Sequence, residues 1–463
     1  MFQVGLHNNA NFMTSEADHH SEAYRRTQFA ASMCYQPSIP DVYDNYEKLD
    51  VEKDLFNPGH HTTMQHASQN IEFVIDNIPV SLVTFGLHMG HPFYNSSQRS
   101  GRYCKTMFDG NRDVRDMYIK EFIRKYTDIG DSKEIIDWVN RGIDYFNNTL
   151  GDITRIAKNA ITIERPYYKG NIDIQAKRIA QDQLRCVIST IAPTGLVHSL
   201  NTISLAAVHK MAWNRPMKAL LSEMVDKLKP SDFDTCFTSK QTNQFCPTVY
   251  FPTSAIIHNN PPVNVLNTMD ELRAIRFILE KLFNSDKNKS SLDIKLYDPN
   301  LNQILNNISA DIRVTVEVPV VTFGQDQRHR TIRRSNPIVT GGFYLPTLLS
   351  GLNGAYQFCK QYMDDYLALC DKHSSHDMIH FIPYGAMVQY TKQADPRSYV
   401  HSFGKRLCWN AESCISKMER FTLQQIYSST SIPVGPNCDL GFCNEGSRSC
   451  GRDIKNKVNR DLL

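Results

Sequence analysis

Two stretches of this chain begin with the same four residues and then diverge. The first is VTFGLHMGHPFYNSSQRSGRY (83–103), and the second, VTFGQDQRHRTIRRSNP (321–337), begins 238 residues later (321 − 83). Each copy places a histidine eight residues after its valine, at His91 and His329. Only the second histidine has an arginine on both sides, and only the first copy continues into Ser-Gly-Arg-Tyr. The offset is about half of the 463 residues and indicates an internal duplication.

The flanking patterns support this interpretation. Residues 70–76 and 311–320 alternate polar and apolar side chains, which predicts a strand before each copy, and the apolar residues 80–90 predict a short helix. Further helical patterns occupy 111–126, 132–150, 174–190, 197–213, 269–284, 356–370 and 378–421. Each half is therefore predicted as a strand, a short helix, a polar tract and several long helices.

The composition is that of an ordinary globular protein, with 41% hydrophobic and 21% charged residues. The net charge of +3 does not indicate nucleic acid as a partner. A chain of this length is too long for one hydrophobic core. The polar segment 229–247 marks the predicted boundary between a domain at 1–235 and a domain at 236–463.

Cysteine usage and hydropathy suggest a cytoplasmic protein. No apolar run approaches the roughly 20 residues of a membrane span, so no membrane partner is expected. The first residues lack the apolar core of a signal peptide. The 12 cysteines lie mostly in apolar segments, which indicates reduced, buried thiols. Cys438, Cys443 and Cys450 are conceivable zinc ligands, but their spacing matches no zinc motif, and no metal is predicted.

Several motifs resemble those of the flavin-dependent thymidylate synthases, the ThyX family. In the first half they are AASMCYQP (30–37), GHHTTMQH (59–66), SSQRSGRY (96–103), DQLRCVIS (182–189) and NTISL (201–205). In the second half they are QDQRHR (325–330), IHFIP (379–383) and DPRSYVHSFGKR (395–406). The resemblance covers most of both halves in the same order. It implies an α+β fold of two ThyX-like domains in tandem, each a small, mainly antiparallel sheet packed with long helices.

The resemblance also implies roles for individual residues. The implied FAD-binding residues are Arg328, His329, Arg330 and Arg397 of the second half, with His61, His66 and Asn201 of the first. The implied substrate-binding residues are Ser100, Arg102, Arg185 and Gln325. The implied catalytic residues are Arg406, which would stabilise negative charge developing on the pyrimidine, and Arg185.

The two halves depart from the family in complementary ways. The first half has Gly90-His91-Pro92 in place of the Arg-His-Arg triplet and Ala212 in place of the final arginine. The second half has Ile338, Thr340, Ile379 and Asp395 at nucleotide-side and flavin-side positions. Arginine suits such sites because its planar fork binds phosphate in two places and keeps its charge. We therefore expect a composite site in which Arg102 of one half meets Arg330 of the other.

The implied reaction is C5 methylation of dUMP to dTMP, with FAD as cofactor and methylenetetrahydrofolate and NADPH as cosubstrates. Gln65, Gln98 and Ser189 replace family residues, so a related hydroxymethylation of dUMP or dCMP is also open. The expected assembly is a homodimer that forms a pseudo-tetramer. Two alternatives are a non-catalytic descendant that binds a nucleotide or a protein partner, and a nucleic-acid-binding protein that uses Arg328, Arg330, Arg333 and Arg334.

Overall fold

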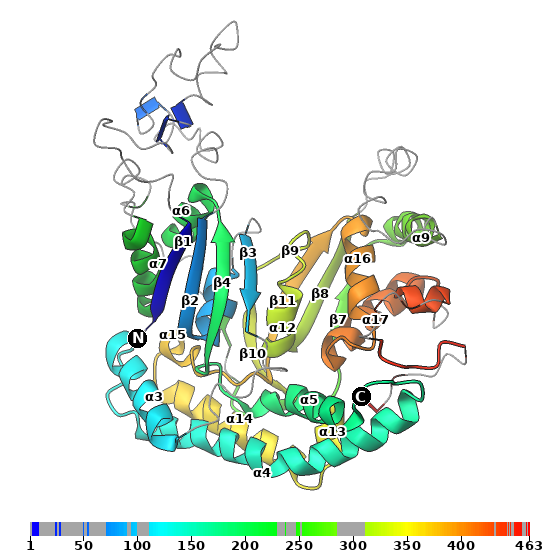
Figure 1. Cartoon of the computed structure of the whole chain (residues 1–463), viewed down its shortest axis with the longest axis horizontal. Coiled ribbons are helices and arrows are strands. Elements are labelled where there is room, and N and C mark those ends of the chain that lie inside the picture. The colour runs from blue at the N-terminus through cyan, green and yellow to red at the C-terminus, as the bar shows by residue number, and fades with distance from the viewer. Residues whose placement is uncertain are drawn as a thin grey trace, which may run out of the picture. The chain divides into compact units, whose positions relative to one another are not determined.

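The computed structural model shows an α+β fold with two mainly antiparallel sheets (Figure 1). It describes residues 2–8, 24–25, 27–28, 50, 53–54, 71–89, 94–99, 111–228, 237, 247–250, 252–284, 311–429, 432–441, 443, 445, 449–455, 460 and 462–463.

The first sheet has four antiparallel strands in the order β1-β2-β4-β3. They are β1 Gln3–Asn8, β2 Ile71–Pro79, β4 Pro193–Leu200 and β3 Tyr94–Gln98. In β2 the side chains of Ile71, Phe73 and Ile75 are fully buried. They share one face because successive side chains of a strand point to opposite sides. The strand predicted before the first VTFG is confirmed.

The second sheet repeats this order as β7-β8-β11-β10; in addition, β5 and β6 pair with β10, and β9 pairs with β11. The repeated strands are β7 Val263–Val265, β8 Ile312–Pro319, β11 Ala386–Ala394 and β10 Ile338–Tyr344. The additional strands are β5 Thr248–Val249, β6 Ile256–His258 and β9 Arg333–Arg334. Alternate residues of β8 are buried, which confirms the strand predicted before the second VTFG.

Each half of the chain also contains helices, several of which lie between the strands in sequence. In the first half they are α2 Val80–Leu82, the π-helix η4 Val83–Leu87, α3 Arg112–Tyr126, α4 Lys133–Glu164, α5 Ile172–Leu184, the 3-10 turn η5 Arg185–Val187, α6 Thr202–Lys210 and α7 Arg215–Leu228. In the second half they are α9 Met269–Asn284, α12 Val320–Asp326, α13 Thr347–Ser350, α14 Ala355–Lys372, α15 Ser375–Met378, α16 Pro396–Arg406, α17 Ser413–Tyr427 and the 3-10 turn η8 Asn437–Leu440. The VTFG residues are thus helical in both copies, as a π-helix in the first and an α-helix in the second.

Two of the predicted helices are wrong in their first part. The stretch at 197–213 begins in β4, and the stretch at 378–421 contains all of β11. Each of these strands lies between two neighbouring strands and is buried on parts of both faces, so its polar–apolar alternation is weak. Each half therefore has a middle strand where the sequence pattern predicted only helices.

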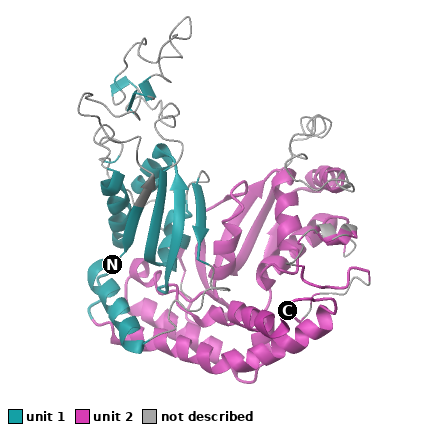
Figure 2. Ribbon diagram, viewed as in Figure 1, with its two compact units in different colours: residues 1–100, 106–130, 191–246 teal, residues 101–105, 131–190, 247–463 magenta. Residues whose placement is uncertain are grey.

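The chain packs into two compact units that are discontinuous in sequence (Figure 2). Unit 1 consists of residues 1–100, 106–130 and 191–246, and unit 2 consists of 101–105, 131–190 and 247–463. The long helices α4 and α5 therefore belong to unit 2. These units are defined by contacts between residues, whereas the boundary predicted at 235 separates two copies of a duplicated sequence. That boundary stays a prediction.

Candidate functional site

The Arg-His-Arg triplet lies in a tight loop after α12. The helix ends at Asp326, and the amide of His329 then donates to the Asp326 carbonyl at 3.0 Å. The amide of Ile332 donates to the His329 carbonyl at 3.2 Å. The chain next enters β9, which pairs with β11. We call residues 327–333 the triplet loop, since it carries Arg328, His329 and Arg330.

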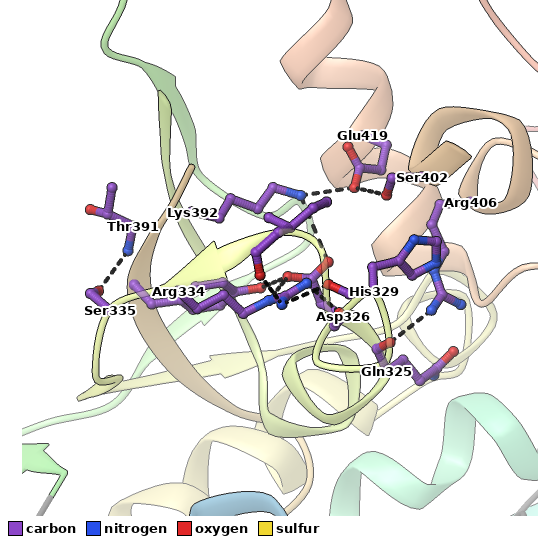
Figure 3. A network of polar contacts seen from close by, with 12 residues as sticks. Gln325, Asp326, His329, Arg334, Ser335, Thr391, Lys392, Ser402, Arg406 and Glu419 are labelled. Atoms are coloured by element: carbon purple, nitrogen blue, oxygen red, sulfur yellow. Dashed lines mark hydrogen bonds and ion pairs between the residues drawn. The ribbon is translucent and has the colours of Figure 1, made fainter. Parts of the chain in front are cut away.

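Arg334, directly after this loop, holds its backbone together (Figure 3). Its Nε donates to Oδ2 of Asp326 at 2.7 Å. Its Nη1 donates to the carbonyls of Ile332 at 2.7 Å and of His329 at 3.1 Å, and its Nη2 donates to the Asp326 carbonyl. One guanidinium therefore bonds three backbone carbonyls of one turn and the carboxylate at the start of that turn.

A buried network of charges supports Arg334. Asp326 also accepts a hydrogen bond from the Tyr390 hydroxyl at 2.8 Å, and the Lys392 ammonium lies 3.8 Å from its other oxygen. Lys392 in turn donates to Glu419 at 2.8 Å. Asp326, Lys392 and Glu419 are fully buried, and the Arg334 side chain is 10% exposed. Two cations thus balance two anions, which is the condition under which buried charges are tolerated.

The ionisation of the central pair follows from these contacts. Burial alone would raise the pKa of the Asp326 carboxyl, but the charges of Arg334 and Lys392 outweigh it and hold that pKa far below its usual range. Burial opposes the charge of Arg334, yet Asp326 raises the pKa of the guanidinium. Both side chains are therefore charged at neutral pH.

His329 is the neutral member of the triplet. Burial, assisted by the positive charge of Arg406, lowers its pKa to about 3. Its ring lies 5.2 Å from that of His401, centroid to centroid. Its Nδ1 atom is buried and has no hydrogen-bond partner among the residues that the structure describes. The imidazole at neutral pH thus offers a hydrogen bond and no charge.

Helix α16 brings further predicted residues to the loop. Nη2 of Arg406 donates to the carbonyl of Gln325 at 2.7 Å, and Figure 3 shows Gln325, His329 and Arg406 beside one another. Arg397, at the other end of α16, lies 3.5 Å from the carboxylate of Asp395, which caps the helix. The structure therefore gathers Gln325, His329 and Arg406, while Arg397 has a local ion pair.

Two predicted residues of the first half make local contacts. Arg185 lies 2.5 Å from the carboxylate of Asp182, and its guanidinium lies 6.0 Å from the ring centre of Tyr384. Asn201 caps α6, where its side-chain oxygen accepts from the amide of Ser204 at 2.8 Å. Both residues therefore make structural contacts, an ion pair for Arg185 and a helix cap for Asn201. Their binding roles stay predictions.

Four other predicted site residues lie outside the described residues. They are His61, His66, Ser100 and Arg102. The composite site that joins Arg102 to Arg330 therefore stays a prediction. The alternative of a four-arginine nucleic-acid surface needs a correction, because Arg334 is buried and engaged with Asp326, whereas Arg328 and Arg333 are exposed.

Sequence patterns missed Asp326, Lys392 and Glu419, and the first half has a different polar contact at the corresponding positions. His88 and Ser96 stand at the VTFG offsets of Asp326 and Arg334. Nε2 of His88 and Oγ of Ser96 lie 2.9 Å apart, and the His88 ring lies 6.2 Å from that of His198. An alignment of the two VTFG copies, continued as far as these positions, was the sequence signal that could have pointed to Asp326 and Arg334.

Within the described ranges, no group of three or more His, Cys, Asp or Glu side chains is placed to hold a metal ion. No helix in that part of the chain is long and apolar enough to cross a membrane.

The structure thus has an α+β fold and an arginine-bearing loop that is held by a network of buried charges. Comparison with known proteins gives the family. Residues 17–227 match the family model described as "Thymidylate synthase complementing protein", so this part of the chain belongs to the ThyX family. The match ends before the triplet loop.

Among solved structures, the chain is similar to thymidylate synthase X (ThyX) from Helicobacter pylori, crystallised with FAD and dUMP. The identity is 14%, the alignment covers 46% of this chain and 94% of that chain, and the TM-score is 0.28. None of the curated proteins matches this chain at a significant level.

Proposed function

We propose that this chain is a ThyX-like enzyme in which two diverged domains share one flavin-dependent site for modifying C5 of a pyrimidine deoxynucleotide. The observation that carries the proposal is the triplet loop, which places His329 beside Arg406 and flanks it with two more arginines. The match of residues 17–227 to the ThyX family supports the reaction class.

A duplication is supported by three correspondences between the halves. Both sheets contain the same order of four antiparallel strands. The middle strand of each half ends at a capped helix, with Asn201 as the cap of α6 and Asp395 as the cap of α16. Within unit 2, Ser189 bridges Pro383, and the two residues occupy the same motif position 194 residues apart (383 − 189).

The residues of the second half fit a flavin nucleotide by charge and by hydrogen-bonding capacity. A pyrophosphate group favours guanidinium donors, and Arg328, Arg330 and Arg406 lie on or against the triplet loop. A buried Nδ1 without a partner in the described part of the chain is a donor or acceptor that a ligand can satisfy. His329 would orient the cofactor, and the arginines would hold its negative charge.

When bound, a reduced flavin supplies the electrons, and the protein supplies position and charge. Arg406 would stabilise negative charge on the pyrimidine. Ser100, Arg102 and Arg185 would bind the nucleotide, with Gln325, and His61 and His66 would lie near the flavin. In this proposal dUMP or dCMP is the substrate, methylenetetrahydrofolate the carbon donor, NADPH the reductant and a homodimer the working assembly.

Tritium release from C5-labelled dUMP and dCMP tests the reaction. With FAD, NADPH and methylenetetrahydrofolate present, release from one of the two nucleotides is expected. Arg102→Ala and Arg330→Ala should each abolish release, but only Arg330→Ala should weaken FAD binding. Full release by either variant would refute the shared site, and absence of release from both nucleotides would refute the reaction.

A second candidate function is nucleotide binding without catalysis. The local ion pair of Arg185 with Asp182 favours loss of the catalytic role implied for this arginine, and nucleotide binding would then depend on Ser100, Arg102 and Gln325. This alternative predicts a protein that binds dUMP or dCMP but retains no flavin on purification.

A further inference from the structure

We propose that Arg334 is a positioning residue, which fixes the backbone of the triplet loop so that Arg328, His329 and Arg330 are preorganised for an anionic ligand. The identity of that ligand rests on the proposed function, whereas the positioning does not. Arg334 itself is too buried and too fully engaged to bind a ligand.

The geometry of the guanidinium is the first argument. Its contacts with the carbonyls of Asp326, His329 and Ile332 span the whole turn. The carbonyls of Asp326 and His329 also accept backbone amides, from His329 and Ile332, so the guanidinium gives each of them a second hydrogen bond. Lysine has a single ammonium in place of this rigid fork and cannot reproduce the pattern. The shape of the loop thus depends on the identity of the side chain as well as on its charge.

The anchoring of Arg334 is the second argument. The Tyr390 hydroxyl donates to the same oxygen of Asp326 that Arg334 contacts, Lys392 lies near the other oxygen, and Lys392 is paired with Glu419. Glu419 also accepts from the Ser402 hydroxyl at 2.9 Å, which ties α16 and α17 to the same network. The network therefore couples the triplet loop to α16, the helix that carries Arg406.

The contrast between the halves is the third argument. Ser96 stands at the position of Arg334 and bonds the His88 side chain, and the triplet position in that half reads Gly90-His91-Pro92. A serine cannot bond several carbonyls of a turn at once. The half that has lost the arginines of the triplet has a serine at the position of Arg334, and the half that has kept the triplet has the arginine.

The test compares Arg334→Lys with Arg333→Lys, which changes the exposed neighbouring arginine in the same way. Without ligand, amide hydrogen exchange of residues 327–333 should speed up at least about tenfold in Arg334→Lys and remain unchanged in Arg333→Lys. The pKa of His329, measured by NMR, should rise from about 3 toward its usual value as the ring gains solvent. FAD affinity should fall at least about tenfold in Arg334→Lys alone.

These readouts separate this inference from the proposed function. If the wild-type protein binds no FAD, the proposed function fails. The exchange rates and the His329 pKa still test whether Arg334 positions the triplet loop. Equal exchange rates and an equal His329 pKa in both variants would overturn the inference that Arg334 positions the triplet loop. If Arg334→Lys does not fold, Tyr390→Phe removes one hydrogen bond to Asp326 at nearly constant volume. It should speed exchange in 327–333 selectively, and an unchanged rate there would overturn the inference.

Discussion

Ser189 and Pro383 face each other across an isolated antiparallel bridge, and each is the last residue of the same motif in its half of the chain. The flanking hydrogen bonds are reciprocal. The amide of Thr190 donates to Ile382, and the amide of Tyr384 donates to Ile188, both at 2.9 Å. Equivalent residues that pair in this way are related by a local two-fold axis, which is the arrangement expected of two copies of one ancestral domain.

Replacing Asp326 should destabilise the protein strongly. Asp326→Asn leaves Arg334 and Lys392 buried with one carboxylate between them, and breaking a buried pair in this way costs about 3–5 kcal/mol. Urea unfolding gives the free energy of unfolding. Asp137→Asn, which breaks the exposed pair with Lys133, is the control and should have little effect on the free energy of unfolding. Similar losses in the two variants would contradict the buried network.

Acid should destabilise the protein through His329 and His380. Burial lowers the pKa of each imidazole to about 3, with Arg406 adding to the effect at His329. In the unfolded chain their pKa is near the usual value of about 6.5, so the unfolded state binds more protons between these values. Stability is therefore lost as the pH falls from 6.5 toward 3.

The measurement is the free energy of unfolding at pH 7 and at pH 5. His329→Gln should reduce the difference between the two by on the order of 1–2 kcal/mol relative to the wild type. An undiminished difference in His329→Gln would show that this ring is not buried in its neutral form.

Asn201 should matter for stability and not for flavin binding. Asn201→Ala removes the cap of α6 and should cost about 1 kcal/mol in the free energy of unfolding. Asp395→Ala at the equivalent cap of α16 should cost a similar amount. A large loss of FAD affinity in Asn201→Ala without a loss of stability would instead support the binding role that the family resemblance implies.

The sequence predicted those parts of the fold whose side-chain pattern is local. The alternation in β2 and β8 was visible because one face of each strand is buried. β11 was missed because Met387 and Val388 are adjacent and both fully buried. Pro383 and Gly385 lie between α15 and β11, in a stretch whose pattern predicted two helices with a break at a proline and no strand.

The candidate site divides in the same way. The triplet itself was visible as a motif, and His329 and Arg406 do lie near one another. The buried network was not visible, because Lys392 finds its partners at Glu419 and Asp326, which are distant in sequence. A lysine in a strand is ordinarily exposed. Only tertiary packing shows that this one is buried and that Arg334 belongs to the scaffold.

Cofactor binding by the second half is the central claim. The most direct measurement is FAD affinity, by fluorescence titration of the purified protein and of two variants, Arg330→Ala and the control Arg313→Ala, which removes the half-buried arginine that pairs with Glu271. The account predicts that the wild type binds FAD, that Arg330→Ala binds at least about tenfold more weakly, and that Arg313→Ala is unchanged. A wild type without FAD affinity, or an Arg330→Ala variant with undiminished affinity, would contradict it.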